Sequence, residues 1–386
     1  MTRKSTWTVC AVAMVSMGAV IQGQAQAQEQ EQEPVQRASA AQTPVAASGL
    51  TVPGGAFAQS SVTIDGRIDL SVDQVHAGAR ATTSYGTPNA STTRMNDNTS
   101  RLAFRGVESL GGGLKAVFGL EYGFNADAGT VTTPNFRHSF VGLQGDWGTV
   151  VAGRLDSGAY GMSPAYSQIG RNVSYVVHDA GAVAIGTRIL NANNRVSNAV
   201  AYKTPEWGGF SATMRVNLAG PDAPATPASP LRNENDFRQY QAAINYDNGP
   251  LRVGLADGKD DKRGGLQAND FRDKVQAVIS YDFDGVRPYA VWGRDHYENT
   301  ARTRGSVNYW LVGAKMVSGV HSIIANYMQR DVQTALTGAI RKFQVGYAYS
   351  LSKRSMLYAF IDRDEGNTAL TDTVTRAVGL GIQHRF

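Results

Sequence analysis

The segment Lys342-Phe343-Gln344-Val345-Gly346-Tyr347-Ala348-Tyr349 alternates apolar side chains with polar or small ones. In a β-strand, successive side chains point to opposite faces, so this alternation gives one apolar face and one polar face. The same two-residue period recurs from about Ser60 to the end of the chain, for example over residues 64–72, 101–105, 118–124, 239–246 and 274–283. The pattern predicts an all-β chain, and no stretch after Ser60 has the length and apolarity of a transmembrane helix.

The breaks between these segments alternate between short turns and long polar loops. Short turns rich in Gly, Asp and Pro are predicted near 108–113, 145–146, 204–208, 248–250, 283–286, 318–320 and 350–354. Long polar loops are predicted near 76–97, 125–134, 156–194, 219–236, 258–271, 296–306, 331–339 and 363–373. The intervals hold about sixteen strands of roughly ten residues, the length that a tilted strand needs to cross a bilayer. We therefore predict a 16-stranded antiparallel transmembrane β-barrel. The alternative, a secreted β-sandwich or propeller, lacks this asymmetry between turns and loops.

The composition narrows the classes of function. Charged residues make up 18% of the chain, against about a quarter in ordinary soluble proteins. The net charge of +5 comes without a sustained basic run, which argues against nucleic-acid binding. Cys10 is the only cysteine, so the rest of the chain has no thiol for a disulfide or a thiolate metal site. No nucleophile elbow, zinc-binding helix motif or phosphate loop occurs. We expect no catalytic residues, no metal and no cofactor.

The N-terminus has the layout of an export signal. Arg3 and Lys4 precede an apolar run over residues 9–21, and Ala25-Gln26-Ala27 supplies a small-x-small cleavage site. This layout predicts a signal peptide over residues 1–27. Residues 28–59 are rich in Gln, Glu, Ala and Pro and are predicted to be a disordered extension. The barrel domain is expected over residues 60–386. A second small-x-small pattern ending at Ala58 leaves open a mature start near Gln59.

The polar faces of the strands predict what the barrel contains. A closed barrel satisfies its backbone hydrogen bonds in lipid, and its inner face can be polar only if the interior holds water or a plug. Sixteen strands leave a channel too wide for side chains to fill. The loop over residues 156–194 is rich in Gly, Ser, Tyr and Ala, and we expect it to fold inward and narrow the channel.

A series of short motifs resembles the general porins of Gram-negative bacteria, in particular those of the beta-proteobacterial type. The motifs are Ser61-Val62-Thr63-Ile64-Asp65-Gly66, Ser100-Arg101-Leu102-Ala103-Phe104-Arg105-Gly106, Leu110-Gly111-Gly112-Gly113-Leu114-Lys115-Ala116, Phe140-Val141-Gly142-Leu143, Gly148-Thr149-Val150, Gly153-Arg154, Asn198-Ala199-Val200-Ala201-Tyr202 and Gly381-Ile382-Gln383-His384-Arg385-Phe386. Their order and spacing carry the resemblance over residues 60–386.

The resemblance implies an outer-membrane porin, a passive diffusion channel for ions and small hydrophilic solutes, with an inward-folded third loop. It further implies a homotrimer in contact with outer-membrane lipid and lipopolysaccharide. Phe386, in phase with Leu380, Ile382 and His384, is then the signal that the barrel-assembly machinery reads.

The porin family also carries a ladder of basic residues on the channel wall, opposite acids of the third loop. By motif, the resemblance assigns its four positions to Arg67, Arg101, Arg154 and Arg195. Arg105 and Arg137 lie in the polar phase of their strands and are further candidates.

The third loop departs from the acid-rich pattern of enterobacterial relatives. Asp179 is the only acid within residues 157–194, and Asp156 lies at the base of the loop, whereas Arg171 and Arg188 add positive charge. A narrow pore with several arginines and few acids attracts anions, so we expect anion preference. Two alternatives stay open: the arginines only pair with wall acids, or the protein is a substrate-specific channel for phosphate or organic anions.

Overall fold

The computed structural model describes residues 60–78, 89–156, 195–218, 237–262, 271–298, 304–333, 338–368 and 372–386. The chain forms two units, residues 1–55 and 56–386, and all described residues belong to the second. The predicted signal peptide over residues 1–27 and the predicted extension over 28–59 lie outside them. No helix among the described residues is long and apolar enough to cross a membrane.

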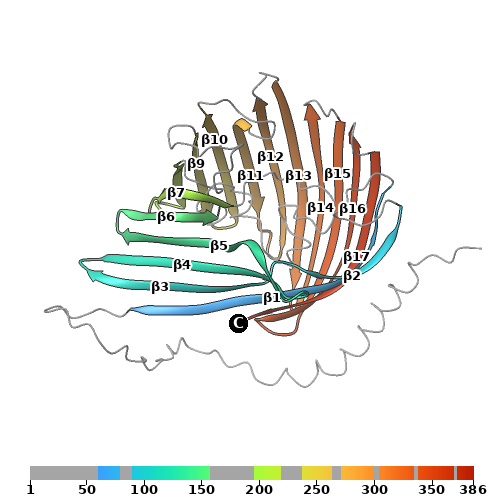
Figure 1. Cartoon of the computed structure of the whole chain (residues 1–386), viewed down its shortest axis with the longest axis horizontal. Helices are drawn as coiled ribbons and strands as arrows, with labels where there is room; N and C mark the ends of the chain where they lie inside the picture. Colours follow the sequence, from blue (N-terminus) through green and yellow to red (C-terminus); the bar gives the residue numbers. More distant parts are fainter. Residues whose placement is uncertain are drawn as a thin grey trace, which may run out of the picture. The chain divides into compact units, whose positions relative to one another are not determined.

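Every element of the described residues is a β-strand (Figure 1). The strands are β1 (Ser61–His76), β2 (Ser91–Asp97), β3 (Arg101–Gly111), β4 (Leu114–Asn125), β5 (Thr130–Gly145), β6 (Gly148–Asp156), β7 (Arg195–Lys203), β8 (Phe210–Asn217), β9 (Phe237–Asn248), β10 (Leu251–Lys262), β11 (Phe271–Tyr281), β12 (Val286–Glu298), β13 (Arg304–Ser318), β14 (His321–Gln333), β15 (Gly338–Ser350), β16 (Ser355–Thr368) and β17 (Asp372–Arg385).

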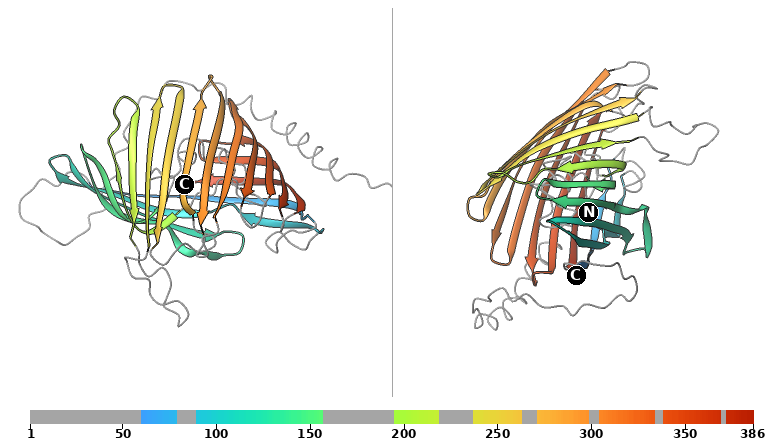
Figure 2. Two further views of the ribbon diagram at one scale, coloured as in Figure 1. Left: turned by 90° about the horizontal axis from the view of Figure 1, so that it is seen from above. Right: turned by 90° about the vertical axis from the view of Figure 1, so that its left-hand side faces the viewer.

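The strands close into one antiparallel ring. From β3 to β17, each strand pairs with its neighbours along the chain, and β17 pairs with β1. On its other side, β1 pairs through residues 61–67 with β3 and through residues 70–76 with β2. β2 and β3 therefore share one position in the ring, so the seventeen segments make sixteen positions. The pairing confirms the predicted sixteen-stranded barrel. Figure 2 shows the same strands from two further sides.

The structure has a short turn at each of the predicted positions. Only residues 112–113, 146–147, 204–209, 249–250, 282–285, 319–320 and 351–354 separate the strands there. In the turn after β11, Asp282 accepts hydrogen bonds from the Gly285 amide at 3.2 Å and from Arg287 Nη2 at 3.0 Å. The Arg287 bond, followed by the Gly285 bond, lowers the pKa of the Asp282 carboxyl. The side chain thus braces a turn in which Asp284 and Gly285 have positive φ.

The strands run further toward the long loops than the sequence predicts. β2 occupies residues 91–97 of the predicted loop 76–97, and β10 continues to Lys262 inside the predicted loop 258–271. Apart from Met95, the side chains of these segments are polar or are glycine, so the apolar alternation stops before the strand does. Pairing continues because backbone hydrogen bonds with the neighbouring strand need no apolar side chain.

Burial in the barrel is inverted relative to a soluble protein. On β15, Lys342 is 1% exposed and Gln344 is 0% exposed. In the opposite phase of the same strand, Phe343 is 44% exposed and Tyr347 is 38% exposed. Large apolar side chains are exposed in the same phase on the other strands, among them Ile64, Val72, Phe104, Val141, Met214, Ile244, Leu255, Trp292, Val312 and Leu380. An apolar outer face with a polar inner face is the arrangement of a barrel in lipid.

Aromatic side chains gather on the outer face at the rim of short turns. Trp147 stacks on Tyr202 with ring centroids 6.4 Å apart, and Tyr281 packs against Phe283 at 4.5 Å. Trp207 lies in the neighbouring short turn and is exposed. These rings have an apolar body and, in Trp and Tyr, a polar tip, which suits the boundary between hydrocarbon and water. This rim therefore has an aromatic girdle.

The inner face is not polar throughout, so the alternation of apolar and polar residues does not fully predict which side chains lie there. One buried apolar cluster spans β11 to β15 and consists of Val278, Tyr289, Val291, Tyr309, Leu311, Met328 and Ile340. These residues share the inner phase with buried polar side chains such as Gln276 and Lys342. The inner face of these strands therefore has an apolar cluster among polar side chains.

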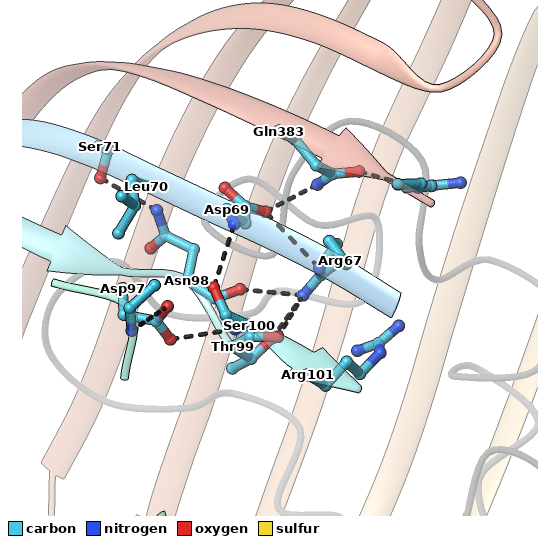
Figure 3. A network of polar contacts seen from close by, with 12 residues as sticks. Arg67, Asp69, Leu70, Ser71, Asp97, Asn98, Thr99, Ser100, Arg101 and Gln383 are labelled. Carbon is cyan, nitrogen blue, oxygen red and sulfur yellow. Dashed lines mark hydrogen bonds and ion pairs between the residues drawn. The ribbon is translucent and has the colours of Figure 1, made fainter. Parts of the chain in front are cut away.

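A polar network joins the first strand of the barrel to its last two strands (Figure 3). The Asp69 carboxylate of β1 accepts hydrogen bonds from Tyr358 Oη of β16 and from Gln383 Nε2 of β17, each at 2.7 Å. Asn98, in the break between β2 and β3, donates through Nδ2 to Tyr358 Oη at 2.8 Å and to Ser71 Oγ at 3.0 Å. Because all these groups are buried, the network stabilises the contact between the first and last strands.

Replacing Tyr358 with Phe is expected to destabilise the barrel. The change removes a buried hydroxyl that serves Asp69 and Asn98, and a lost bond to a buried charged group costs about 1–3 kcal/mol. Thermal unfolding of the protein in detergent should show a lower midpoint for this variant. Tyr281→Phe, at an exposed outer position, is the matched control. Equal midpoints for the two variants would contradict a stabilising role for the network.

Candidate functional site

A group of charged side chains lies on the inner face of β1, β3, β4 and β5. In the register, Ala103 of β3 pairs with Asp65 on one side and with Glu121 on the other. Arg101 and Arg105 are two residues to either side of Ala103, so they share its face. The pairing thus brings two arginines and two carboxylates from three strands onto one patch of the wall.

Glu121 is the centre of this patch. Arg137 Nε donates to Glu121 Oε1 at 2.8 Å. Arg105 Nη2 and Arg101 Nε lie 3.5 and 3.6 Å from Glu121 Oε2. Arg105 also forms an ion pair with Asp65. One carboxylate therefore holds three guanidinium groups close together.

A bulge in β5 brings Arg137 to this patch. Glu121 pairs with His138, but the next residue, Tyr122, pairs with Phe136. Arg137 is the extra residue between them, and such an extra residue redirects a side chain out of the regular alternation. The contact between Arg137 and Glu121 depends on this irregularity, which the spacing in the sequence does not reveal.

Arg67 and Arg385 extend the positive charge along the wall. Arg67 of β1 pairs with Arg101 of β3 on one side and with Arg385 of β17 on the other. We call Arg67, Arg101, Arg105, Arg137 and Arg385 the arginine cluster. Its neighbouring carboxylates are Asp65, Asp69 and Glu121, so five arginines face three acids, an excess of two positive charges among these described side chains.

Arg67 also has a structural role. It is 7% exposed, and its Nη2 donates to the carbonyl oxygens of Asn98 at 2.9 Å and Thr99 at 3.1 Å, and to Thr99 Oγ1 (Figure 3). Thr99 has a φ of 66°, so the backbone at this break turns its carbonyls away from the regular ladder. Arg67 donates hydrogen bonds to these carbonyls. The residue therefore adds positive charge to the wall and also stabilises the break between β2 and β3.

Arg154 lies away from the cluster. It pairs in register with Ser139 and shares the phase of the exposed Val150. Its Nε donates to the Phe136 carbonyl at 3.0 Å and its Nη1 to Ser197 Oγ at 2.7 Å. The resemblance implies a ladder position for Arg154, but the regular alternation of β6, in which Val151 and Leu155 are buried, puts Arg154 in the opposite phase.

The remaining predicted site residues surround the third loop. Asp156 and Arg195 pair through their backbones at the ends of β6 and β7, and their side chains lie outside the described part. Asp179, and with it the predicted inward folding of the loop, lies outside the described residues. For these three residues the constriction role stays a prediction.

The predicted set omits further inner cations, among them the following three. Arg385 belongs to the cluster, Arg215 of β8 donates to Gln239 Oε1 at 3.0 Å, and Lys342 of β15 lies 3.1 Å from Asp362 Oδ1. Each stands in the polar phase of its strand, which is a signal the sequence carries. Lys342 is balanced by Asp362 and by Asp364 at 3.7 Å, so it adds no excess charge to the wall.

Within the described residues, no three His, Cys, Asp or Glu side chains lie where they could hold a metal ion. A closed strand ring with an apolar outside and a charged inner wall defines a membrane channel of the β-barrel class.

Comparison with known proteins gives the family. The model of the Gram-negative porin family matches residues 43–369. Outer membrane porin protein 32 of Delftia acidovorans is 30% identical over 338 residues, covering 84% of this chain and 90% of that protein. An outer membrane porin protein of Bordetella pertussis is 29% identical over 386 residues, covering 86% of this chain and 96% of that protein. The chain belongs to the Gram-negative porin family and is a porin of the outer membrane.

Solved structures agree with this assignment. The anion-selective porin from Comamonas acidovorans superimposes with a TM-score of 0.64 at 25% identity, covering 85% of this chain and 100% of that one. OmpT of Vibrio cholerae, at 12% identity, has a TM-score of 0.60 and covers 85% and 98%. The second likeness concerns the fold alone.

Replacing Glu121 with Gln is expected to lower the stability of the barrel by about 2 kcal/mol at low salt, because three arginines lose a shared carboxylate. Salt screens the repulsion that remains, so the loss should shrink as ionic strength rises. Chemical denaturation at several salt concentrations measures both effects. Glu206→Gln, in an exposed short turn, should change little at any salt. A loss that salt leaves unchanged would rule out repulsion as its cause.

Proposed function

We propose that this outer-membrane porin is a passive diffusion channel that prefers anions over cations. The observation that carries the proposal is the excess of arginines over carboxylates in the arginine cluster on the inner wall. Charges on a low-dielectric wall focus the field into the water they face and raise the local concentration of counter-ions. The Comamonas relative, described as anion-selective, supports the same preference.

In the proposed mechanism the cluster guides ions without binding them tightly. Glu121 and Asp65 hold Arg101, Arg105 and Arg137 in place, so the guanidinium groups need no rearrangement when an ion passes. The remaining charge attracts an anion, and the carboxylates keep the attraction weak enough for release, as conduction requires. The ladder role of Arg154 and Arg195, and the constriction role of Asp156 and Asp179, remain part of this proposal.

Reversal potentials across planar bilayers in a KCl gradient test the preference. The natural porin should favour chloride, and R101Q/R105Q should lower the chloride-to-potassium permeability ratio by about tenfold, since focused wall charge changes local ion concentration by at least that order. K353Q/R354Q removes the same charge from an exposed short turn and should leave the ratio unchanged. Cation preference in the natural porin would overturn the proposal.

The same recordings address two finer points of the proposal. A homotrimer should insert in steps of three equal conductances. A general pore should conduct in proportion to salt concentration, whereas saturation by phosphate or one organic anion would instead favour the substrate-specific alternative.

We propose that the chain is exported by its signal peptide, residues 1–27, and that the extension 28–59 plays no part in the channel. The last strand would then be recognised by the barrel-assembly machinery. Leu380, Ile382 and Phe386 are 41%, 49% and 42% exposed on the outer face, in the phase that such a partner could read. The proposed partners also include outer-leaflet lipid and lipopolysaccharide.

Phe386→Ala is expected to reduce the folded porin in the outer membrane several-fold. The Phe386 backbone bonds to Gly66 at 3.0 and 3.2 Å in both directions, and these bonds do not require the ring. Refolding into lipid vesicles, without any machinery, should therefore still succeed. His384→Ala, in the same outer phase, is the control. Normal assembly of Phe386→Ala in cells would remove the ring as a signal.

A further inference from the structure

A groove of about 300 Å³ lies on the barrel wall where β14, β15 and β16 approach the long-loop rim. Its lining residues are Tyr327, Arg341, Lys342, Phe343, Arg363 and Glu365. The Lys342 ammonium is engaged with Asp362 on the inner side. The other lining side chains belong to the opposite phase, which places the groove on the outside of the barrel rather than in the channel.

The strand register arranges the groove in two rows. In the first, Tyr327 pairs with Phe343, and Phe343 pairs with Arg363. Arg363 in turn pairs with Arg376 of β17, which is exposed on the same outer face. In the second row, one step nearer the long loops, Gln329 pairs with Arg341 and Arg341 with Glu365. Two aromatic rings thus border three arginines on neighbouring strands.

The contacts within the groove compensate its positive charge only in part. Arg341 Nε donates to the neutral Gln329 Oε1 at 3.3 Å. Arg363 Nη2 donates to Glu365 Oε2 at 3.1 Å, with the two side chains 48% and 43% exposed. A pair this exposed contributes little. Asp331 lies on the same face, where its Oδ1 accepts from Gln329 Nε2 at 2.8 Å. Arg341, Arg363 and Arg376 therefore face two carboxylates, Glu365 and Asp331, which leaves an excess of one positive charge among these side chains.

The height of these arginines on the barrel wall determines which part of the membrane they contact. On the side of the short turns the outer face is apolar, with Tyr347 and Ile323 exposed. An arginine among lipid tails costs about 2–4 kcal/mol at the bilayer midplane and little near the interface. Three arginines in the lipid-facing phase therefore mark the level of the headgroups. In an outer-membrane porin the rim of long loops faces outward, so this is the outer leaflet.

We propose that the groove binds the phosphate of an anionic, phosphorylated outer-leaflet lipid. Arg341 and Arg363 form the binding pair, since a guanidinium offers phosphate two parallel donors. The acyl part of the lipid lies over Tyr327 and Phe343. This proposal rests on the contact with outer-leaflet lipid proposed above, and it assigns that contact to particular residues.

A lipid fits the groove better than its competitors. A soluble phosphate would contact the arginines but not the two aromatic rings beside them. These rings are Tyr327, 39% exposed, and Phe343, 44% exposed. A second copy of the chain would have to supply an acidic patch on its outer face at the same height. The combination of cations and adjoining apolar rings is the chemistry of a phosphorylated headgroup attached to hydrocarbon.

Native mass spectrometry of the full porin in detergent tests the site. The probes are a diphosphorylated lipid A, the same lipid with its phosphates removed, and inorganic phosphate. R341Q/R363Q should bind the phosphorylated lipid about thirtyfold more weakly, which corresponds to about 1 kcal/mol for each arginine. K353Q/R354Q, which removes equal charge at the opposite rim, should bind like the natural porin. The dephosphorylated lipid should bind weakly to all three, and inorganic phosphate should not displace the lipid.

Each other result counts against the groove. Unchanged binding by R341Q/R363Q would place the lipid elsewhere on the barrel, and equal loss in K353Q/R354Q would mean that overall charge, not this groove, binds it. Displacement by inorganic phosphate would make the site one for soluble anions, and dissociation of the oligomer in R341Q/R363Q would make it an interface between copies. If the natural porin binds no phosphorylated lipid at all, the broader lipid contact fails as well. The reversal potential of R341Q/R363Q should equal that of the natural porin, so the test is separate from ion preference.

Discussion

Water is absent from the hydrocarbon core of a membrane, so every backbone N–H and C=O of a spanning chain must bond within the protein. This porin meets the constraint by closing its sheet on itself. β1 carries the closure, because it pairs with β17 on one side and with β2 and β3 on the other. The last residue completes it, where the backbones of Gly66 and Phe386 exchange hydrogen bonds. The buried contacts of Asp69 with Tyr358 and Gln383 hold this closure from the inside.

Closure also separates the two chemistries of the chain. Once the sheet curves into a ring, one phase of every strand faces outward and the other faces inward, so a single alternation supplies both the lipid surface and the channel wall. The charges of the wall are not spread evenly. An apolar cluster around Tyr309 and Leu311 covers part of the inner face, and the arginine cluster occupies another. Elsewhere on the wall, Lys342 lies beside Asp362 and Asp364, so the excess of positive charge belongs to the arginine cluster.

The outer face also carries two kinds of side chain, apolar and charged. Phe343 and Arg363 are paired neighbours, yet one suits acyl chains and the other suits headgroups. Aromatic rings and guanidinium groups thus lie side by side on the outer face, near the rim of long loops. Aromatic pairs such as Trp147 and Tyr202 lie at the opposite rim, that of the short turns. The barrel is thus positioned in the membrane by its outer side chains, independently of what the channel carries.

Local patterns in the sequence determined the fold class, the number of strands and each of the short turns. They could do so because alternation is a property of neighbouring residues, and tight turns require particular residues such as Asp284 and Gly285, both with positive φ. The polar phase likewise placed Arg101 and Arg105 on the inner face. The outward phase of the final strand, and of Phe386 directly after it, also follows from the alternation of the residues there.

Only the tertiary structure decided which charges meet. The ion pair of Arg137 with Glu121 needs a bulge in β5, and Arg154 reaches the Phe136 carbonyl of β5 and Ser197 of β7. A strand's register depends on its partner rather than on its own residues, so no single segment encodes it. The groove of Arg341 and Arg363 arises in the same way, since three strands must lie side by side before their outer side chains form one site.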